Sequence, residues 1–173
     1  MYLLSRIVTF QPRFKSAFRD LNLEWIRKYF RVEAKDLEQV NNPESCLAQG
    51  GEIFFVLNEA QESQNDDQVQ AIGTCAMYKN GPNRYELAKM AVRPDHQGRG
   101  LGTLLMKTAE EWAQGRDARE VLILSNTILE PAICLYRKFG YKTVHLGPHP
   151  DYERCNIEML KCLSPLKTLV SEK

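Results

Sequence analysis

The sequence predicts a single domain of the mixed α/β (α+β) class over residues 1–173, with its core at about 3–162 and a loosely held tail at 163–173. Two observations predict this class. β-rich segments follow one another in the first half, as in an antiparallel sheet, and a strand–loop–helix–strand unit follows them. The length of 173 residues is that of one domain.

The first third of the chain predicts one strand and two helices. Leu3 to Phe10 is β-rich and ends at Pro12. Phe14 to Phe30 has apolar residues at spacings of three and four, which is typical of a helix. Its core-facing stripe is expected to include Phe14, Phe18 and Leu21. Pro43 to Gln49 predicts a short helix that begins after Asn42 and stops at two glycines.

Two strands and an exposed connection are expected next. Glu52 to Asn58 and Val69 to Tyr78 are β-rich. Residues 59–68 are polar and acidic without periodicity, which predicts an exposed hairpin loop. Gly73, inside the second strand, indicates a bulge or a close backbone approach.

The second half contains the unit around which the domain is organised. An apolar strand over Glu86 to Val92 is broken by Pro94 and followed by a glycine-rich loop and an amphipathic helix that ends near Gly115. Glu120 to Ser125 is fully apolar, so we expect it in the middle of the sheet, parallel to residues 86–92. The remaining elements are expected to be a helix over 130–139, a strand over 141–144, a loop over 145–151 and a strand over 154–162.

The glycine-rich loop predicts an anion site. The first turn of the helix that follows has free N–H groups and a positive dipole end, and glycines let a ligand approach the backbone closely. A phosphate suits such a site. A P-loop is excluded because Lys107-Thr108 follows Met106 and not glycine, and the dinucleotide fingerprint fails because Thr103 stands at its third glycine position.

Composition limits the function classes. The net charge of +1 gives no support for a nucleic-acid or membrane surface, and no apolar run is long enough to span a bilayer. Five cysteines without a C-x-x-C motif favour a reducing, cytoplasmic location. The three histidines do not cluster with cysteines, so no metal site is expected.

Two motifs in this setting carry a family resemblance. Gln97-x-x-Gly100-x-Gly102 resembles the signature by which GNAT-superfamily N-acetyltransferases bind the pyrophosphate of acetyl-CoA. The segment 132–141 (AICLYRKFGY) resembles the family element A-x-x-L-Y-x-x-x-G-F/Y. Residues 21–30 look like a bacterial-type subgroup that is also found fused to MarR-like regulators. The resemblance implies a mixed sheet of six or seven strands with about four helices, splayed between strands 4 and 5.

The resemblance also implies acetyl-CoA as the acetyl donor. Backbone groups of residues 90–92 are expected to pair with the pantetheine arm. Asn126 is expected at the edge of the splay, either bonding that arm or serving as a turn or cap residue. The full set of expected cofactor-binding residues is Met90, Ala91, Val92, Gln97, Gly98, Arg99, Gly100, Leu101, Gly102, Thr103, Asn126 and Tyr136.

Two catalytic roles have candidate residues. Glu86 is the candidate general base, with Glu24 as the second candidate and with a rim ion pair or a water chain as the alternatives. Its neighbour Lys89 is an odd number of positions away, so the two side chains are expected on opposite faces. By resemblance, Tyr136 is the acid toward the leaving thiolate. Because a phenol protonates a thiolate only uphill, by ~2 kcal/mol, we expect it mainly to orient the sulfur.

The acceptor site is expected between the first helix and the last hairpin. Its candidates are Glu24, Trp25, Tyr29, Tyr152 and Arg154. Arg154 either clamps a carboxylate of the acceptor or forms a structural ion pair.

The expected activity is direct acetyl transfer, in a ternary complex, to a primary amine of a small molecule such as an amino acid or polyamine. The alternatives are a protein-lysine or N-terminal acetyltransferase, or a regulatory acetyl-CoA-binding module. A monomer and a homodimer are both compatible with the sequence.

Overall fold

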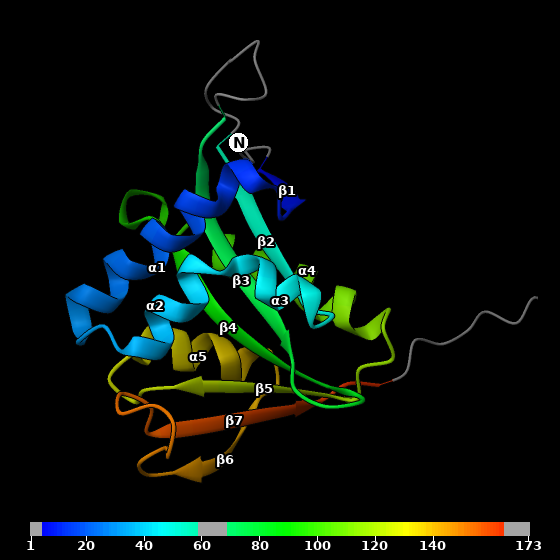
Figure 1. Ribbon diagram of the computed structural model, residues 1–173. Coiled ribbons are helices and arrows are strands. Elements are labelled where there is room, and N and C mark those ends of the chain that lie inside the picture. Colours follow the sequence, from blue (N-terminus) through cyan, green and yellow to red (C-terminus); the bar gives the residue numbers. More distant parts are fainter. Residues whose placement is uncertain (1–4, 59–68, 165–173) are drawn as a thin grey trace, which may run out of the picture.

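The structure is a computed structural model that describes residues 5–58 and 69–164. Its centre is one mixed seven-stranded sheet with the order β1-β2-β3-β4-β5-β7-β6 (Figure 1). The expected mixed class and strand number are therefore confirmed. The strands are β1 (Arg6–Thr9), β2 (Glu52–Leu57), β3 (Ala71–Lys79), β4 (Arg84–Val92), β5 (Glu120–Ser125), β6 (Lys142–Leu146) and β7 (Ile157–Cys162).

Helices cover both faces of this sheet, and each face has its own apolar cluster (Figure 1). The first is covered by α1 (Lys15–Tyr29), α2 (Ala34–Asn41) and α3 (Pro43–Ala48), and the second by α4 (Leu101–Gln114) and α5 (Glu130–Lys138). Phe14, Phe18 and Leu21 are buried, as the helical stripe predicted. Helix α2 was not predicted, so the described ranges hold five α-helices where about four were expected.

The sheet divides between β4 and β5. These strands pair in parallel only at Arg84–Glu86 with Glu120–Leu122. Beyond Glu86 they diverge, which confirms the expected splay. All other neighbouring strands are antiparallel. Residues of both strands beyond this pairing line a cavity, and the candidate site lies there.

A β-bulge in β4 changes the direction of one side chain. Thr74 opposes Ala91 and Ala76 opposes Ala88, so Lys89 and Met90 together face Cys75. Lys89 has a φ of 51°, in the left-handed region that glycine favours. The extra residue turns Lys89 onto the face of the sheet that carries α1 and α2. The expectation that Lys89 and Glu86 point to opposite faces is therefore wrong, because strict alternation fails at the bulge.

Other boundaries differ from the expectations by a few residues. β4 begins at Arg84, two residues before its predicted start, and β6 extends through Leu146 into the predicted loop. The predicted irregularity at Gly73 is confirmed, because the β2–β3 register shifts where Val56 opposes Gly73 and Leu57 opposes Ala71. The predicted loop 59–68 and tail residues 165–173 lie outside the described residues. In the part of the chain that is described, no helix has the length and apolarity that a membrane crossing needs.

Candidate active site

The glycine-rich loop forms an open cradle at the start of α4. Gly98 and Gly100 have φ values of 75° and 79°, and a Cβ added at either would meet no atom within 4 Å. Gly100 is the residue before the helix, and its carbonyl accepts from the N–H of Leu104 at 3.0 Å. The N–H groups of the first turn have no partners within the helix. An anionic group can therefore approach this backbone without steric hindrance.

Side chains around the loop hold it against β4. The Gln97 side-chain amide donates to the carbonyl of Val92 at 2.9 Å. The Arg99 guanidinium donates to the carbonyl of Asp95 at 3.1 Å. Gly102 allows α4 to approach α5, because a Cβ there would lie 3.3 Å from the Leu135 side chain. The loop is therefore fixed at both ends.

A cleft of about 490 Å³ runs from this loop along β4 and α5. Nine of the residues expected to bind the cofactor line it. They are Met90, Ala91, Val92, Gln97, Gly98, Gly100, Leu101, Gly102 and Thr103. Tyr29, an expected acceptor-site residue, also lines this cleft. Arg99 is not among its lining residues. An open glycine cradle at a helix N-terminus, continued by an exposed strand backbone, suits a pyrophosphate followed by an extended arm.

A smaller cavity of about 130 Å³, here called the chamber, adjoins the cleft inside the splay. Trp25, Met90, Leu129 and Ala132 line both spaces, so the two hollows are adjacent. The chamber also brings together both candidate catalytic residues, Glu86 and Tyr136, and three others expected near it. Those three are Asn126, Tyr152 and Arg154.

Glu86 lies in the chamber wall with its carboxyl group largely removed from water. Burial raises the pKa of Glu86, while the charges of Lys35 and Lys89 and a hydrogen bond with Asn80 oppose this shift. Among residues 5–58 and 69–164, Glu86 has no ion-pair partner within 4 Å. A buried carboxylate with a raised pKa can accept a proton near neutral pH.

Tyr136 and Asn126 stand on the opposite side of the splay. Tyr136 is 8% exposed, and burial raises the pKa of its phenol to about 12, with the Ser125 side chain acting in the other direction. The Asn126 amide donates to the carbonyl of Arg154 at 2.6 Å, and its oxygen accepts from the N–H of Ile128 at 3.0 Å. Asn126 therefore shapes the turn after β5 and ties it to the β6–β7 loop.

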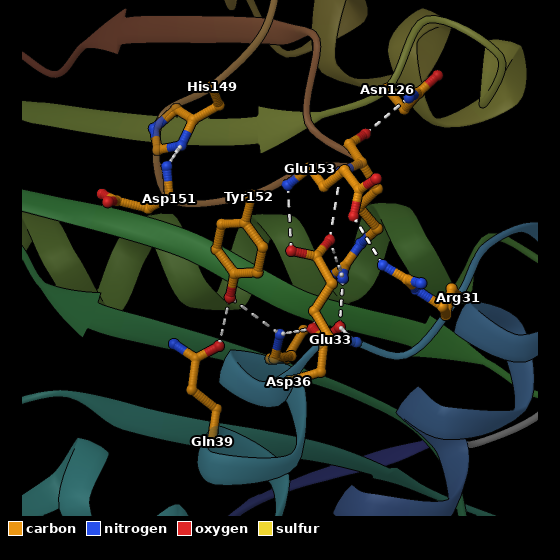
Figure 2. A network of polar contacts seen from close by, with 11 residues as sticks. Arg31, Glu33, Asp36, Gln39, Asn126, His149, Asp151, Tyr152 and Glu153 are labelled. Atoms are coloured by element: carbon orange, nitrogen blue, oxygen red, sulfur yellow. Dashed lines mark hydrogen bonds and ion pairs between the residues drawn. The ribbon is translucent and has the colours of Figure 1, made fainter.

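A buried polar network closes the other end of the chamber (Figure 2). Asp36 is fully buried and lies 2.9 Å from the Lys89 ammonium and 2.7 Å from Nη2 of Arg154, whose Nη1 contacts its second oxygen. Burial acts to raise the pKa of Asp36, but the Arg154 hydrogen bond and the Lys89 charge outweigh it and hold this pKa below its usual value. The Tyr152 hydroxyl accepts from Lys89 at 3.5 Å and donates to Gln39 at 2.7 Å.

Glu33 completes this network at the N-terminus of α2. Its backbone N–H donates to Asp36 at 3.0 Å, and its carboxylate accepts from the N–H groups of Glu153 and Arg154 at 3.1 and 3.2 Å. Figure 2 shows Glu33 lying between α2 and the β6–β7 loop. Helix α2, which the sequence analysis missed, is therefore what fixes the position of this loop.

The structure separates Glu24 from the other acceptor candidates. Glu24 is exposed and lines a different surface hollow, with Asp20 and Arg93 among its neighbours. The chamber instead contains Lys89, Phe30 and Ser125, which the sequence analysis did not assign to a site. The spacing of Glu33 and Asp36, which form a capping box, is the sequence signal that could have revealed α2.

Comparison with known proteins agrees with this geometry. The family model described as Acetyltransferase (GNAT) family matches residues 18–141. An uncharacterised N-acetyltransferase of Schizosaccharomyces pombe is 30% identical over 100 residues, covering 56% of this chain and 61% of its own length. The chain thus spans less than two thirds of the length of the curated relatives it matches.

Solved structures share the fold over nearly the whole chain. A GNAT acetyltransferase from Staphylococcus aureus Mu50 superposes with a TM-score of 0.79 at 16% identity, over 92% of this chain and 99% of its own. An aminoglycoside 6'-N-acetyltransferase solved with coenzyme A has a TM-score of 0.64 at 18% identity, over 94% and 99% of the two chains. With the sheet splay, the glycine cradle and the match over residues 18–141, the chain belongs to the GNAT family of acetyltransferases.

Proposed function

We propose that this protein transfers the acetyl group of acetyl-CoA directly to a primary amine of a small molecule. The observation that carries the proposal is the adjacency of the cleft and the chamber, which share Trp25, Met90, Leu129 and Ala132 as lining residues. The cleft begins at an anion cradle, and the chamber holds a buried carboxylate and a buried phenol. Acetyl-CoA would supply the activated thioester to be cleaved.

The glycine loop and β4 would hold the donor. N–H groups of Gly100, Leu101 and Gly102 suit the pyrophosphate, and the backbone of residues 90–92 suits the pantetheine arm. Because the bulge interrupts the β3–β4 ladder at Lys89 and Met90, which both line the chamber, an N–H near Met90 is suited to stabilise the oxyanion. One such donor, if well aimed, contributes about 3 kcal/mol to the transition state.

Glu86 would act as the base. Deprotonating an alkylammonium with pKa ~10.4 costs ~4.6 kcal/mol at pH 7, so a nearby acceptor of that proton is useful. The new N–C bond forms as the C–S bond breaks, and the amine proton passes to Glu86, directly or through a water. Its raised pKa makes this carboxylate a better proton acceptor than an exposed glutamate.

Tyr136 would donate a hydrogen bond toward the leaving sulfur. With a pKa of about 12, against ~8.5 for a thiol, full proton transfer from the phenol is uphill by ~5 kcal/mol. Orientation and hydrogen bonding of the thiolate are therefore the favoured role. The CoA thiolate can leave and take its proton from solvent.

The deciding experiment measures release of the CoA thiol from acetyl-CoA with a panel of amines, polyamines, amino acids and basic peptides between pH 7 and 9. We expect turnover with a small-molecule class and a loss of at least about 100-fold in kcat/KM for Glu86→Gln, in the range of general base catalysis. Turnover only with peptides would favour the protein-directed alternative. Tight acetyl-CoA binding without turnover would favour a regulatory module.

A further inference from the structure

The charges that surround the chamber are not balanced evenly. Two cations, Lys89 and Arg154, face it together with the carboxylate of Glu86, and both cations are already paired with carboxylates on α2. Asp36 contacts both, and Glu33 lies 3.5 Å from Nη1 of Arg154. Among the charged groups that line the chamber or pair with its lining, three carboxylates stand against two cations, and Glu86 is the carboxylate without an ion-pair partner; Lys35, whose charge also acts on Glu86, does not line the chamber.

Neither cation is free to bind an anionic ligand. The side chain of Lys89 is 3% exposed, and its ammonium is held between Asp36 and the Tyr152 hydroxyl. Nη1 and Nη2 of the Arg154 guanidinium each donate a hydrogen bond to one oxygen of Asp36. Because Asp36 is fully buried, a ligand carboxylate that displaced it from Lys89 and Arg154 would leave the Asp36 charge in the interior without a partner.

Two other cationic side chains act on Glu86 from outside the chamber lining, and each contacts a neighbouring side chain. The Lys35 ammonium lies 4.4 Å from the centre of the Tyr152 ring, and His149 lies 3.5 Å from the Glu158 carboxylate. Lys35 comes from α2 and His149 from the β6–β7 loop, so these groups approach the chamber from two sides. The chamber wall also contains apolar and aromatic side chains, among them Trp25, Phe30 and Leu124.

We infer that the acceptor is a small primary amine that carries no carboxylate near its amine. This inference rests on the proposed function and names the acceptor class of the same site. An ammonium entering the chamber meets the unpaired carboxylate of Glu86 and an aromatic wall, both of which favour a cation. An amino acid would bring a second carboxylate beside Glu86 while the two cations of the chamber wall, Lys89 and Arg154, are already paired, which raises the cost of its desolvation. Arg154 therefore acts as a structural ion-pair residue, not as a clamp for an amino-acid acceptor.

The test compares acceptors that differ only in charge. The probes are 4-aminobutanoate with 4-aminobutanamide, and 6-aminohexanoate with 6-aminohexanamide, which are closely matched in size within each pair. We expect kcat/KM for the amide to exceed that for the acid about tenfold or more in the shorter pair. A smaller ratio is expected in the longer pair, whose carboxylate reaches farther from Glu86. A ratio below about threefold in the shorter pair would overturn the inference.

A binding measurement keeps this test separate from catalysis. Titration calorimetry of the protein saturated with CoA, using the same four compounds, needs no turnover. Preferential binding of the amides without acetylation would support the acceptor inference and count against the proposed activity. Acetylation in which the acids react as well as or better than the amides would support the proposed activity and overturn the acceptor inference. If none of the four compounds binds or reacts, the inference is overturned.

Variants of the network give a second, independent readout. Asp36→Asn keeps the shape of the side chain but leaves Lys89 and Arg154 with one fewer counterion. We expect the amide-to-acid ratio to fall by about tenfold, because the freed cations then favour a carboxylate. Glu33 lies nearer the surface, so Glu33→Gln should also lower the amide-to-acid ratio of kcat/KM, but by a smaller factor. Thermal melts and CoA affinity report whether each variant is folded, and an unchanged ratio in a folded Asp36→Asn protein would contradict the charge argument.

Discussion

Replacing Asp36 with alanine should destabilise the protein strongly. The carboxylate is fully buried and neutralises an ammonium that is 3% exposed and a guanidinium that is 15% exposed. Removing one partner of a buried pair costs about 3–5 kcal/mol, because the remaining charge stays in the interior without compensation. Glu33 still lies 3.5 Å from Arg154, so Lys89 is the cation that loses most.

The position of Lys89 adds to this cost. Its φ of 51° is unfavourable for a residue with a Cβ, by roughly 1–2 kcal/mol. The ion pair with Asp36 offsets that strain and holds the bulge in place. We therefore expect Asp36→Ala to loosen the β4 backbone beside the cleft as well as to lower global stability.

Urea unfolding, followed by circular dichroism, measures the effect. A loss of about 3–5 kcal/mol corresponds to a fall in Tm of about 6–20 °C for a chain of this size. The double variant Asp36→Ala with Lys89→Met is the matched control, because methionine keeps much of the stem and carries no charge. It should recover a large part of the loss. A loss below about 1 kcal/mol for Asp36→Ala, or no recovery in the double variant, would refute the reasoning.

Three further predictions concern the cleft and the chamber. Glu86 has a raised pKa in the folded protein, so its ionisation favours unfolding and stability falls as pH rises from the unfolded pKa through the folded one. Glu86→Gln should therefore melt higher than the wild type at pH 8 and equally near pH 4, and equal melting at pH 8 would contradict this. Tyr136→Phe should lower kcat about 10- to 100-fold with little change in the KM for acetyl-CoA, and an unchanged kcat would exclude a role at the sulfur. Gly100 has a φ of 79°, so Gly100→Ala should strain the backbone by about 1 kcal/mol and weaken the acetyl-CoA affinity measured by calorimetry. Gly115 has a φ of −64°, so Gly115→Ala is the control and should leave that affinity unchanged.

The donor side of the site could be predicted from sequence because its signals are local. The glycine loop, the helix that begins at Leu101 and the strand before it occupy one continuous stretch, and the cleft is lined by nine of the residues that this stretch and the family resemblance indicated. Backbone geometry here depends on Gly98 and Gly100 themselves. Tyr136 was found in the same way, from a motif within one helix.

The acceptor side depends on contacts between distant parts of the chain. Lys89 pairs with Asp36 across 53 residues, and Asp36 pairs with Arg154 across 118. Helix α2 has only eight residues, so its few apolar positions were too short a pattern to reveal it. Its capping box is a local signal, but the hydrogen bonds that Glu33 accepts from the β6–β7 loop join residues about 120 positions apart and could not be predicted from it.

The bulge at Lys89 explains why the chemistry of the acceptor was the hardest part to predict. Alternation along β4 places Lys89 away from Glu86, and a bulge residue in the left-handed region is expected to be glycine. A lysine can hold that conformation here because Asp36, from another helix, compensates it. The same carboxylate neutralises Arg154, which the sequence alone made equally suitable for binding an acidic acceptor. One buried aspartate therefore holds the direction of a strand residue and neutralises two cations of the chamber wall.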